Sequence, residues 1–189
     1  VHGGAVELIY PHHEAEIAQA EAYTGHKPFV KYWVHTGLLK LGREKMAKSS
    51  GNYITIREAL EKWSPELLRF YFLSTKYRRS MVFDEEKMMK LESKLRVVER
   101  FWDRCQRLSS TDVEGSLSPK IRALAQRFTA HMNEDFNTPA AIQDLYEVAE
   151  LINTSTTMEA EGALKNSYQT IASILAALGL FSVKHNWST

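Results

Sequence analysis

The sequence has 189 residues, of which 44% are hydrophobic, and its formal net charge is +1 at pH 7. This length can bury a sizeable core in one domain or in two small ones. The net charge says nothing by itself about nucleic acid, because RNA binding needs a local basic cluster more than a basic average. No apolar run approaches the ~20 residues of a membrane span, and the start of the chain, VHGG, lacks a basic and apolar leader. We therefore expect a cytoplasmic protein with no membrane partner.

The first eighty residues predict a mixed α/β structure. The apolar run 6–10 follows two glycines and predicts a buried parallel strand, and Pro11 suits the first turn of a helix that ends near Gly25. Aromatic and β-branched residues predict a strand or hairpin over 32–41, and a polar loop follows over 42–52.

The rest of the chain is predicted to be helical. Thr55 and Glu58 form a capping box for a short helix, and Ser64 with Pro65 begins the next one. After Asp84, apolar residues recur at spacings of three and four, which predicts a long amphipathic helix. We expect four helices after Asp84, packed as a bundle.

The single cysteine, Cys105, excludes an intrachain disulfide and a metal site made of local thiolates. We interpret Cys105 as a packing residue. The chain starts at Val1 rather than at Met, and we expect that an upstream part has been cut away.

Two short segments carry residues suited to chemistry. His12 and Glu16 are four residues apart on one predicted helix face, where an imidazole and a carboxylate can reach one Zn²⁺, but two ligands do not complete a site and solvated charge is an alternative. Lys45 and Lys48 are three apart in a loop with Gly51, and their ammonium groups can contact a polyphosphate. The charge pattern alone is equally compatible with a solvated surface loop.

Residues 45–49, KMAKS, resemble the KMSKS signature of class I aminoacyl-tRNA synthetases. Further segments resemble the cysteinyl-tRNA synthetase family in particular, in order and over nearly the whole chain. They are residues 2–4 (HGG), 11–14 (PHHE), 32–37 (YWVHTG), 51–57 (GNYITIR), 68–71 (LRFY) and 134–139 (EDFNTP). Many class I synthetases share a KMSKS-like loop, whereas the PHHE and EDFNTP segments at these separations indicate one family.

The resemblance implies the α/β edge of a Rossmann-like class I synthetase catalytic domain followed by an all-α helical bundle, mostly helical overall. Residues 1–52 would be the C-terminal part of the nucleotide-binding domain, 53–83 a stem-contact-like connecting region, and 84–189 the helical bundle. The family's HIGH motif and anticodon-reading region have no counterpart in the sequence, so this piece alone is expected to be inactive.

The activity implied by the resemblance is that of a cysteine–tRNA ligase. Such an enzyme joins cysteine to the α-phosphate of ATP, which binds with Mg²⁺, and then passes the cysteinyl group to the 3′ end of tRNA(Cys). Lys48 would contact ATP and support the pentavalent phosphate, with Lys45 assisting. The other ATP contacts that the resemblance implies are Ser49, Gly51, His2, Gly3, Gly4 and Glu7.

A zinc ion is also implied, because the family holds one through two cysteines, a histidine and a glutamate. The last two ligands fall on His12 and Glu16, and Cys105 is in the wrong place to supply either of the others. A cysteine thiolate is a far better zinc ligand than the hydroxyl of serine, so the metal would select the substrate.

A basic cluster is the candidate contact for the acceptor stem of tRNA, although an ordinary charged helix end explains it equally well. Its members are Arg69, Lys76, Arg78 and Arg79. Lysines and arginines on the long helix after Asp84 alternate with glutamates and are predicted to be a solvated face.

The sequence departs from the family at Ala5, Glu7, Ala15 and Ala47, where glycine, aspartate, asparagine and serine are usual. The longer side chain of Glu7 could shift or lose a contact with the nucleotide. Two other functions stay open. One is a cysteine ligase of the mycothiol-biosynthesis type, which passes the same adenylate to an amine. The other is a non-catalytic helical module that binds RNA or protein.

Overall fold

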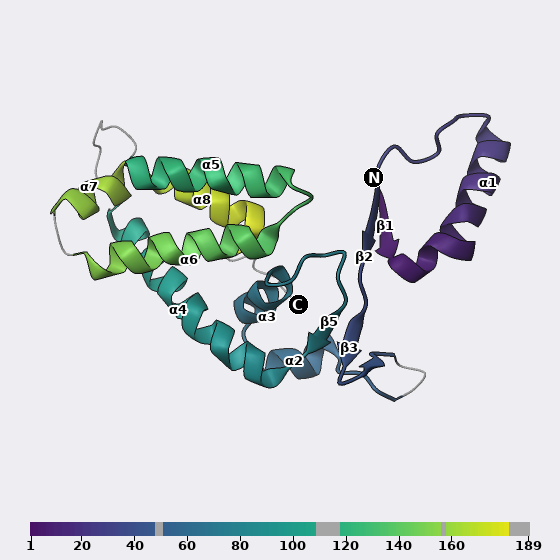
Figure 1. Cartoon of the computed structure of the whole chain (residues 1–189), viewed down its shortest axis with the longest axis horizontal. Coiled ribbons are helices and arrows are strands. Elements are labelled where there is room, and N and C mark those ends of the chain that lie inside the picture. The colour runs from purple at the N-terminus through teal and green to yellow at the C-terminus, as the bar shows by residue number, and fades with distance from the viewer. Residues whose placement is uncertain (48–50, 109–117, 156–157, 182–189) are drawn as a thin grey trace, which may run out of the picture. The chain divides into compact units, whose positions relative to one another are not determined.

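The computed structural model describes residues 1–47, 51–108, 118–155 and 158–181. The chain divides into two compact units, and Figure 1 shows the elements of both. The first unit contains Val1–Thr55 and Tyr77–Asp84, and the second contains Ile56–Lys76 and Glu85–Thr189.

The first unit is built on short strands. β1 (His2–Ala5) pairs in parallel with β2 (Trp33–Thr36). In a second sheet, β3 (Leu39–Leu41) lies between β4 (Glu44–Lys45), which is antiparallel to it, and β5 (Met81–Phe83), which is parallel. Residues 81–83 thus complete a sheet that includes residues 39–41, which lie 42 positions earlier in the sequence.

The strand expected over residues 6–10 is not formed. Parallel pairing with β2 falls on residues 2–5, where His2 is the partner of Trp33. The side chains of Val6 and Tyr10 are exposed, so this apolar run does not enter a core.

Residues 6–13 instead make two short helical turns, interrupted by the extended backbone of Tyr10, that lead into a helix. η1 (Val6–Leu8) is a 3₁₀ turn and η2 (Ile9–His13) is a π turn, followed by α1 (Glu14–Thr24). The predicted end of this helix is confirmed, because Gly25 takes the left-handed conformation with φ 69° and its N–H bonds to the carbonyl of Glu21.

The expected strand or hairpin over 32–41 is two strands that do not pair with each other. β2 pairs with β1, whereas β3 pairs with β4 and β5. Because the two strands belong to different sheets, the segment connects the sheets and is not a hairpin.

The second unit opens with the two short helices that the sequence predicts. They are α2 (Ile56–Lys62) and α3 (Pro65–Leu73). The side-chain oxygen of Ser64 caps α3 by accepting a bond of 3.2 Å from the backbone N–H of Leu67. The inward face of α3 is buried, with Phe70 and Tyr71 almost completely removed from solvent.

The rest of the second unit is a bundle of five helices over its described residues, one more than expected, since a short helix lies between the last two long runs. The five are α4 (Glu85–Leu108), α5 (Pro119–Asn133), α6 (Thr138–Thr154), α7 (Met158–Lys165) and α8 (Tyr168–Leu178). α6 packs against both α4 and α5, and α5 packs against α8 (Figure 1). Val98, Leu124 and Leu145 are fully buried in this core, and each such side chain contributes about 1.5–3 kcal/mol of transfer free energy.

The two compact units divide the chain differently from the predicted connecting region over 53–83. α3 packs on α4 and α6, which places residues 56–76 in the helical unit. β5 pairs with β3, which places residues 77–84 in the strand unit. In the described part of the chain, no helix is both long enough and apolar enough to span a membrane.

Candidate functional site

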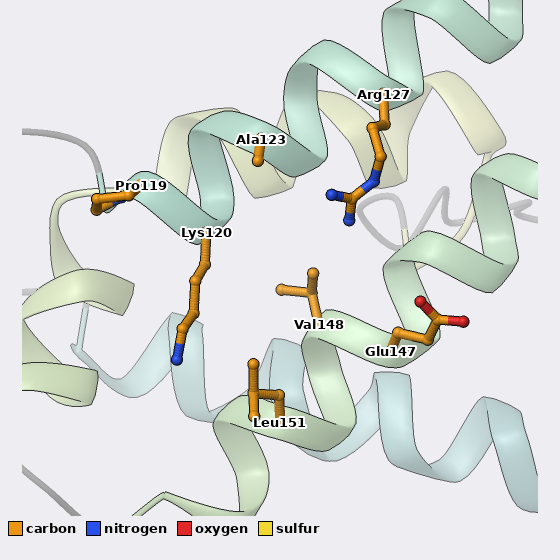
Figure 2. A pocket seen from close by; sticks show the side chains of 7 residues that line it. All are labelled: Pro119, Lys120, Ala123, Arg127, Glu147, Val148 and Leu151. Carbon is orange, nitrogen blue, oxygen red and sulfur yellow. The ribbon is translucent and has the colours of Figure 1, made fainter.

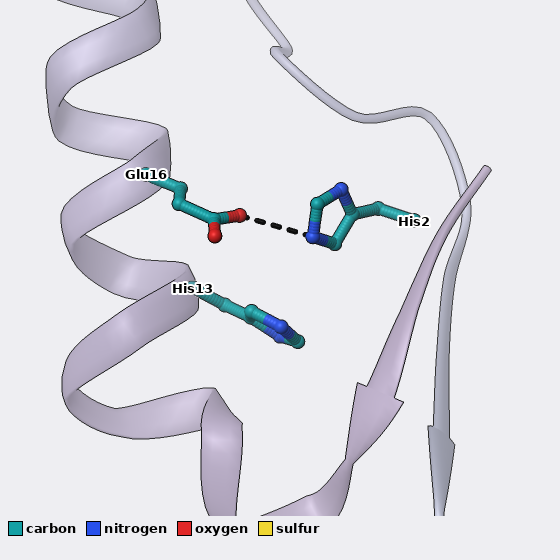
Figure 3. Close-up of side chains that lie close together, drawn as sticks. All are labelled: His2, His13 and Glu16. Carbon is teal, nitrogen blue, oxygen red and sulfur yellow. Dashed lines mark ion pairs between the residues drawn. The ribbon is translucent and has the colours of Figure 1, made fainter.

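Three side chains of the first unit meet beside β1 and could hold a cation. His2 extends from β1, while His13 and Glu16 extend from the end of η2 and the first turn of α1 (Figure 3). One ligand atom from each lies within 4.8 Å of the other two. Imidazole nitrogens and carboxylate oxygens are common zinc donors, so the donor set fits that metal.

A glycine makes this approach possible. A Cβ at Gly4 would lie 3.0 Å from Cε1 of His13 and 2.9 Å from Cδ1 of Leu8. A Cβ at position 4 would crowd Leu8 and the imidazole of His13, and both side chains would have to shift slightly to accommodate it. Glycine at this position therefore leaves room for His13 beside the strand.

The carboxylate of Glu16 faces His2. Its Oε2 lies 3.0 Å from Nε2 of His2, and the two groups form an ion pair (Figure 3). Among the described residues this oxygen accepts no hydrogen bond, and the Glu16 side chain is 45% exposed. The oxygen could therefore also serve as a donor to a cation.

The imidazole of His13 also contacts the rings of His35 and Trp33. Nδ1 of His13 lies 2.9 Å from Nε2 of His35, so one of these nitrogens donates to the other. The ring of Trp33 stacks on His35 with an interplanar angle of 5°, and its centroid is 5.0 Å from that of His13. His13 is thereby held in a buried position.

The structure does not place His12 in this cluster. His12 is exposed on η2, whereas its neighbour His13 points toward His2. Glu16 therefore belongs both to the predicted zinc pair and to the cluster that the structure shows. The sequence offered one signal for His13, its position three residues before Glu16, which also puts the two on one helix face.

Lys45, at the start of the lysine loop, makes an ion pair within the same unit. Lys45 lies in β4, and its Nζ donates to Oε1 of Glu7 in η1. Beyond Lys45, the backbone N–H of Ala47 bonds to the carbonyl of Asn52 at 3.0 Å, which closes the loop.

Gly51 has φ 70°, a conformation that suits glycine in a tight turn. Lys48 and Ser49 lie outside the described residues.

Two of the three predicted ATP-contacting glycines, Gly3 and Gly4, lie on β1. Gly3 is close to β2, since a Cβ there would be 3.4 Å from the carbonyl oxygen of Val34. His2, Gly3, Gly4, Glu7 and Lys45 thus all belong to one unit.

The basic cluster predicted to contact tRNA is divided between the units. Arg69 and Lys76 belong to the second unit, and Arg78 and Arg79 to the first. Nζ of Lys76 lies 3.8 Å from the carboxylate of Glu134.

A surface pocket of about 410 Å³ lies between α5 and α6, where sequence reasoning indicated no site (Figure 2). Ala123, Val148 and Leu151 form its apolar wall, and Lys120 and Arg127 reach its rim from α5. The guanidinium of Arg127 is already paired with Asp144 at 3.0 Å.

Comparison with known proteins identifies the class of protein to which the chain is similar. Residues 1–93 match the family model described as the tRNA synthetases class I (C) catalytic domain, and residues 127–182 match the DALR domain. A structure of the agnB2 LeuRS of Agrobacterium radiobacter K84, solved as a ternary complex with tRNA and LeuAMS, is similar with a TM-score of 0.73 at 17% identity, covering 94% of this chain and 25% of that one. These matches confirm the predicted fold class, the edge of a class I synthetase catalytic domain followed by a helical bundle.

Curated relatives narrow the class to one family. The cysteine–tRNA ligase of Dehalococcoides mccartyi strain 195 is 41% identical over 178 residues, which are 94% of this chain and 37% of the relative. The cysteine–tRNA ligase of Geobacter sp. strain M21 is 38% identical over 187 residues, which are 95% of this chain and 39% of the relative. The chain belongs to the cysteinyl-tRNA synthetase family, as its motifs predicted, and spans less than half the length of these relatives.

Proposed function

We propose that the chain is part of a cysteine–tRNA ligase, which activates cysteine with ATP and transfers it to the 3′ end of tRNA(Cys) in the cytoplasm. The observation that carries this proposal is the Glu7–Lys45 ion pair, which joins β4, at the start of the lysine loop, to the segment that follows the glycines of β1. The segment that we propose to contact the nucleotide and the start of the lysine loop belong to the same compact unit.

Lys45 and Lys48 supply positive charge to the triphosphate in this proposal. Negative charge grows on the α-phosphate as the cysteine carboxylate attacks it, and a positioned ammonium group lowers the energy of that state. Ser49 and Gly51 shape the loop, His2, Gly3 and Gly4 lie along the nucleotide with Glu7 in the segment that follows them, and ATP carries Mg²⁺.

Zinc would be held by His12 and Glu16, with His2 and His13 within reach of the same carboxylate. When bound, zinc offers a site that prefers a thiolate to a hydroxyl and so favours cysteine over serine. The carboxylate of Glu16, with one ligand atom each of His2 and His13 within 4.8 Å, supports a cation at this position. Gly4 leaves room for the imidazole of His13, and the ring of Trp33 packs against that imidazole.

The acceptor stem of tRNA would contact Arg69, Lys76, Arg78 and Arg79. Such contacts go to phosphates and set the register of the RNA without reading its sequence. The guanidinium carbon of Arg78 also lies 4.9 Å from the ring centroid of Tyr77, within the range of a cation–π contact.

The proposal is tested by cysteine-dependent exchange between ATP and pyrophosphate in the complete protein. We expect exchange with cysteine and not with serine, and a loss of at least about tenfold in Lys48→Ala, since one charged transition-state contact is worth more than 1.4 kcal/mol. Lys90→Ala is the matched control, because Lys90 is an exposed lysine on α4 paired with Glu86. Transfer of the activated cysteine to tRNA(Cys), and not to an amino sugar, distinguishes a tRNA ligase from a ligase that uses an amine. Absence of exchange in the intact protein would refute the proposal.

A further inference from the structure

The ion pair between Lys45 and Glu7 joins residues 38 positions apart in the sequence. Lys45 Nζ contacts Oε1 of Glu7, and the two side chains are 46% and 43% exposed. Both groups are therefore open to solvent and to a ligand, and neither is locked in a core. The pair connects β4, at the start of the lysine loop, with η1, directly after β1.

We propose that Glu7 is a positioning residue that controls how readily Lys45 binds ATP. The inference rests on the proposed function, because it concerns the same lysine. The carboxylate of Glu7 holds the ammonium group of Lys45 when no nucleotide is bound. The triphosphate of ATP must displace that carboxylate before it can bind the ammonium group.

The physical reason is that two anions compete for one cation. The ammonium group of lysine is a compact charge with three donors, and a contact with a carboxylate neutralises much of its field. An exposed ion pair is weak, because solvent and salt screen it. The pair can therefore be displaced by the several negative charges of a triphosphate.

The chain length of Glu7 contributes to the contact. A glutamate carboxylate extends one methylene farther than that of aspartate, so Glu7→Asp draws the acceptor back from Lys45. We expect this variant to weaken the pair while it keeps the charge, which makes it an intermediate between the wild type and Glu7→Gln.

The opposite role for Glu7 is a direct contact with the nucleotide. In that case its loss would raise the KM for ATP, and it would do so whether or not Lys45 is present. Competition for Lys45 predicts a lower KM, and only while Lys45 is present. The two roles therefore differ both in sign and in dependence on Lys45.

The experiment is a double-mutant cycle in the complete protein with Glu7→Gln, Lys45→Ala and the double variant. The KM for ATP is measured in cysteine-dependent exchange, and the Kd for ATP by equilibrium dialysis. We expect Glu7→Gln to lower both constants by about twofold to fivefold, the range set by exposed ion pairs, and to have no further effect in Lys45→Ala. The difference in KM and Kd for ATP between the wild type and Glu7→Gln should decrease as ionic strength rises.

Glu44→Gln is the matched control. Glu44 is exposed and adjacent to Lys45 in β4, so the variant removes a neighbouring charge and leaves the Glu7 contact in place. We expect its constants to equal those of the wild type. A rise in both constants in Glu7→Gln, or an equal change with and without Lys45, would overturn the inference. If the wild type shows no exchange, the proposed function fails, while the Kd values still test the competition.

Discussion

Arg69 of α3 lies directly against Gly179, the residue that ends α8. A Cβ at Gly179 would stand 2.2 Å from Nη1 of Arg69, and Gly179 itself has φ 66°. The last carbonyl groups of a helix attract cations, so the guanidinium is placed favourably at this helix end. Arg69 thus has a structural role in the second unit, in addition to the tRNA contact proposed for it.

We predict that Gly179→Ala destabilises the protein. Alanine in the left-handed region costs about 1–2 kcal/mol, and its Cβ must also displace the guanidinium of Arg69. Urea unfolding checks the loss, and Arg69→Ala in the same background should recover the part caused by crowding. Gly162→Ala is the control, since no atom of another described residue outside the helix's own backbone lies within 4 Å of a Cβ there and alanine is the better helix former in α7. A Gly179→Ala protein as stable as the wild type would contradict the structure.

A second prediction concerns Arg104, which caps the end of α6. Its Nη1 donates to the carbonyl oxygens of Ile152 and Ser155, both at 2.9 Å, and its side chain is 18% exposed. We expect Arg104→Ala to lower the free energy of unfolding by about 2–3 kcal/mol, because two charge-assisted hydrogen bonds are lost and two carbonyls are left without that donor.

The matched control for Arg104 lies on the same helix. Arg96 is exposed and paired with Glu92 one turn away, which raises the pKa of the guanidinium through that hydrogen bond. We expect no measurable change in stability for Arg96→Ala. Equal losses in the two variants would mean that Arg104 acts through charge or helix propensity and not through its capping contacts.

The third prediction is a dependence of stability on alkaline pH. Burial raises the pKa of the Cys105 thiol from 9.0 to about 12. Folded chains therefore keep the thiol proton in a range where unfolded chains have lost it, so the free energy of unfolding falls as pH rises from 9.0 toward 12.

The comparison of wild type with Cys105→Ala isolates this effect from the titration of other groups. We expect the stability difference between them to be constant below pH 8.5 and to decrease by about 1.4 kcal/mol per pH unit above pH 9. The thiol should also resist a disulfide reagent in the folded protein, because Sγ is buried and faces the carbonyl of Leu164 at 3.7 Å. A flat difference up to pH 10.5 would rule out a raised pKa.

The fourth prediction concerns the metal ligands. In the complete protein, Glu16→Gln and His12→Ala should lose zinc, whereas His13→Ala should keep zinc and lower the melting temperature, because His13 packs with His35 and Trp33. Zinc content by mass spectrometry and thermal melts are the two measurements.

Glu14→Gln is the control for charge on α1, since Glu14 is exposed there. The opposite pattern, zinc lost in His13→Ala and kept in His12→Ala, would assign the metal to the cluster of His2, His13 and Glu16.

Much of the fold could be predicted because its signals are local. Ser64 and Pro65 begin α3, Gly25 ends α1, and the apolar period after Asp84 marks α4, since caps and helical faces depend on residues within a few positions. The short α7 was missed, as a helix of eight residues carries little periodicity. The run 6–10 was misread, because an apolar segment gives no information on which residues will pair with a distant strand.

The sequence by itself determined the family, through KMAKS, PHHE and EDFNTP, and the residue types needed for phosphate and zinc chemistry. Only the tertiary structure decided which of two adjacent histidines turns toward Glu16, that Glu7 meets Lys45, and that residues 81–83 return to the sheet of β3. The reason is that motifs depend on neighbours in sequence, whereas these relationships depend on pairing between segments far apart. Such pairing is fixed by strand register and by packing of the whole unit.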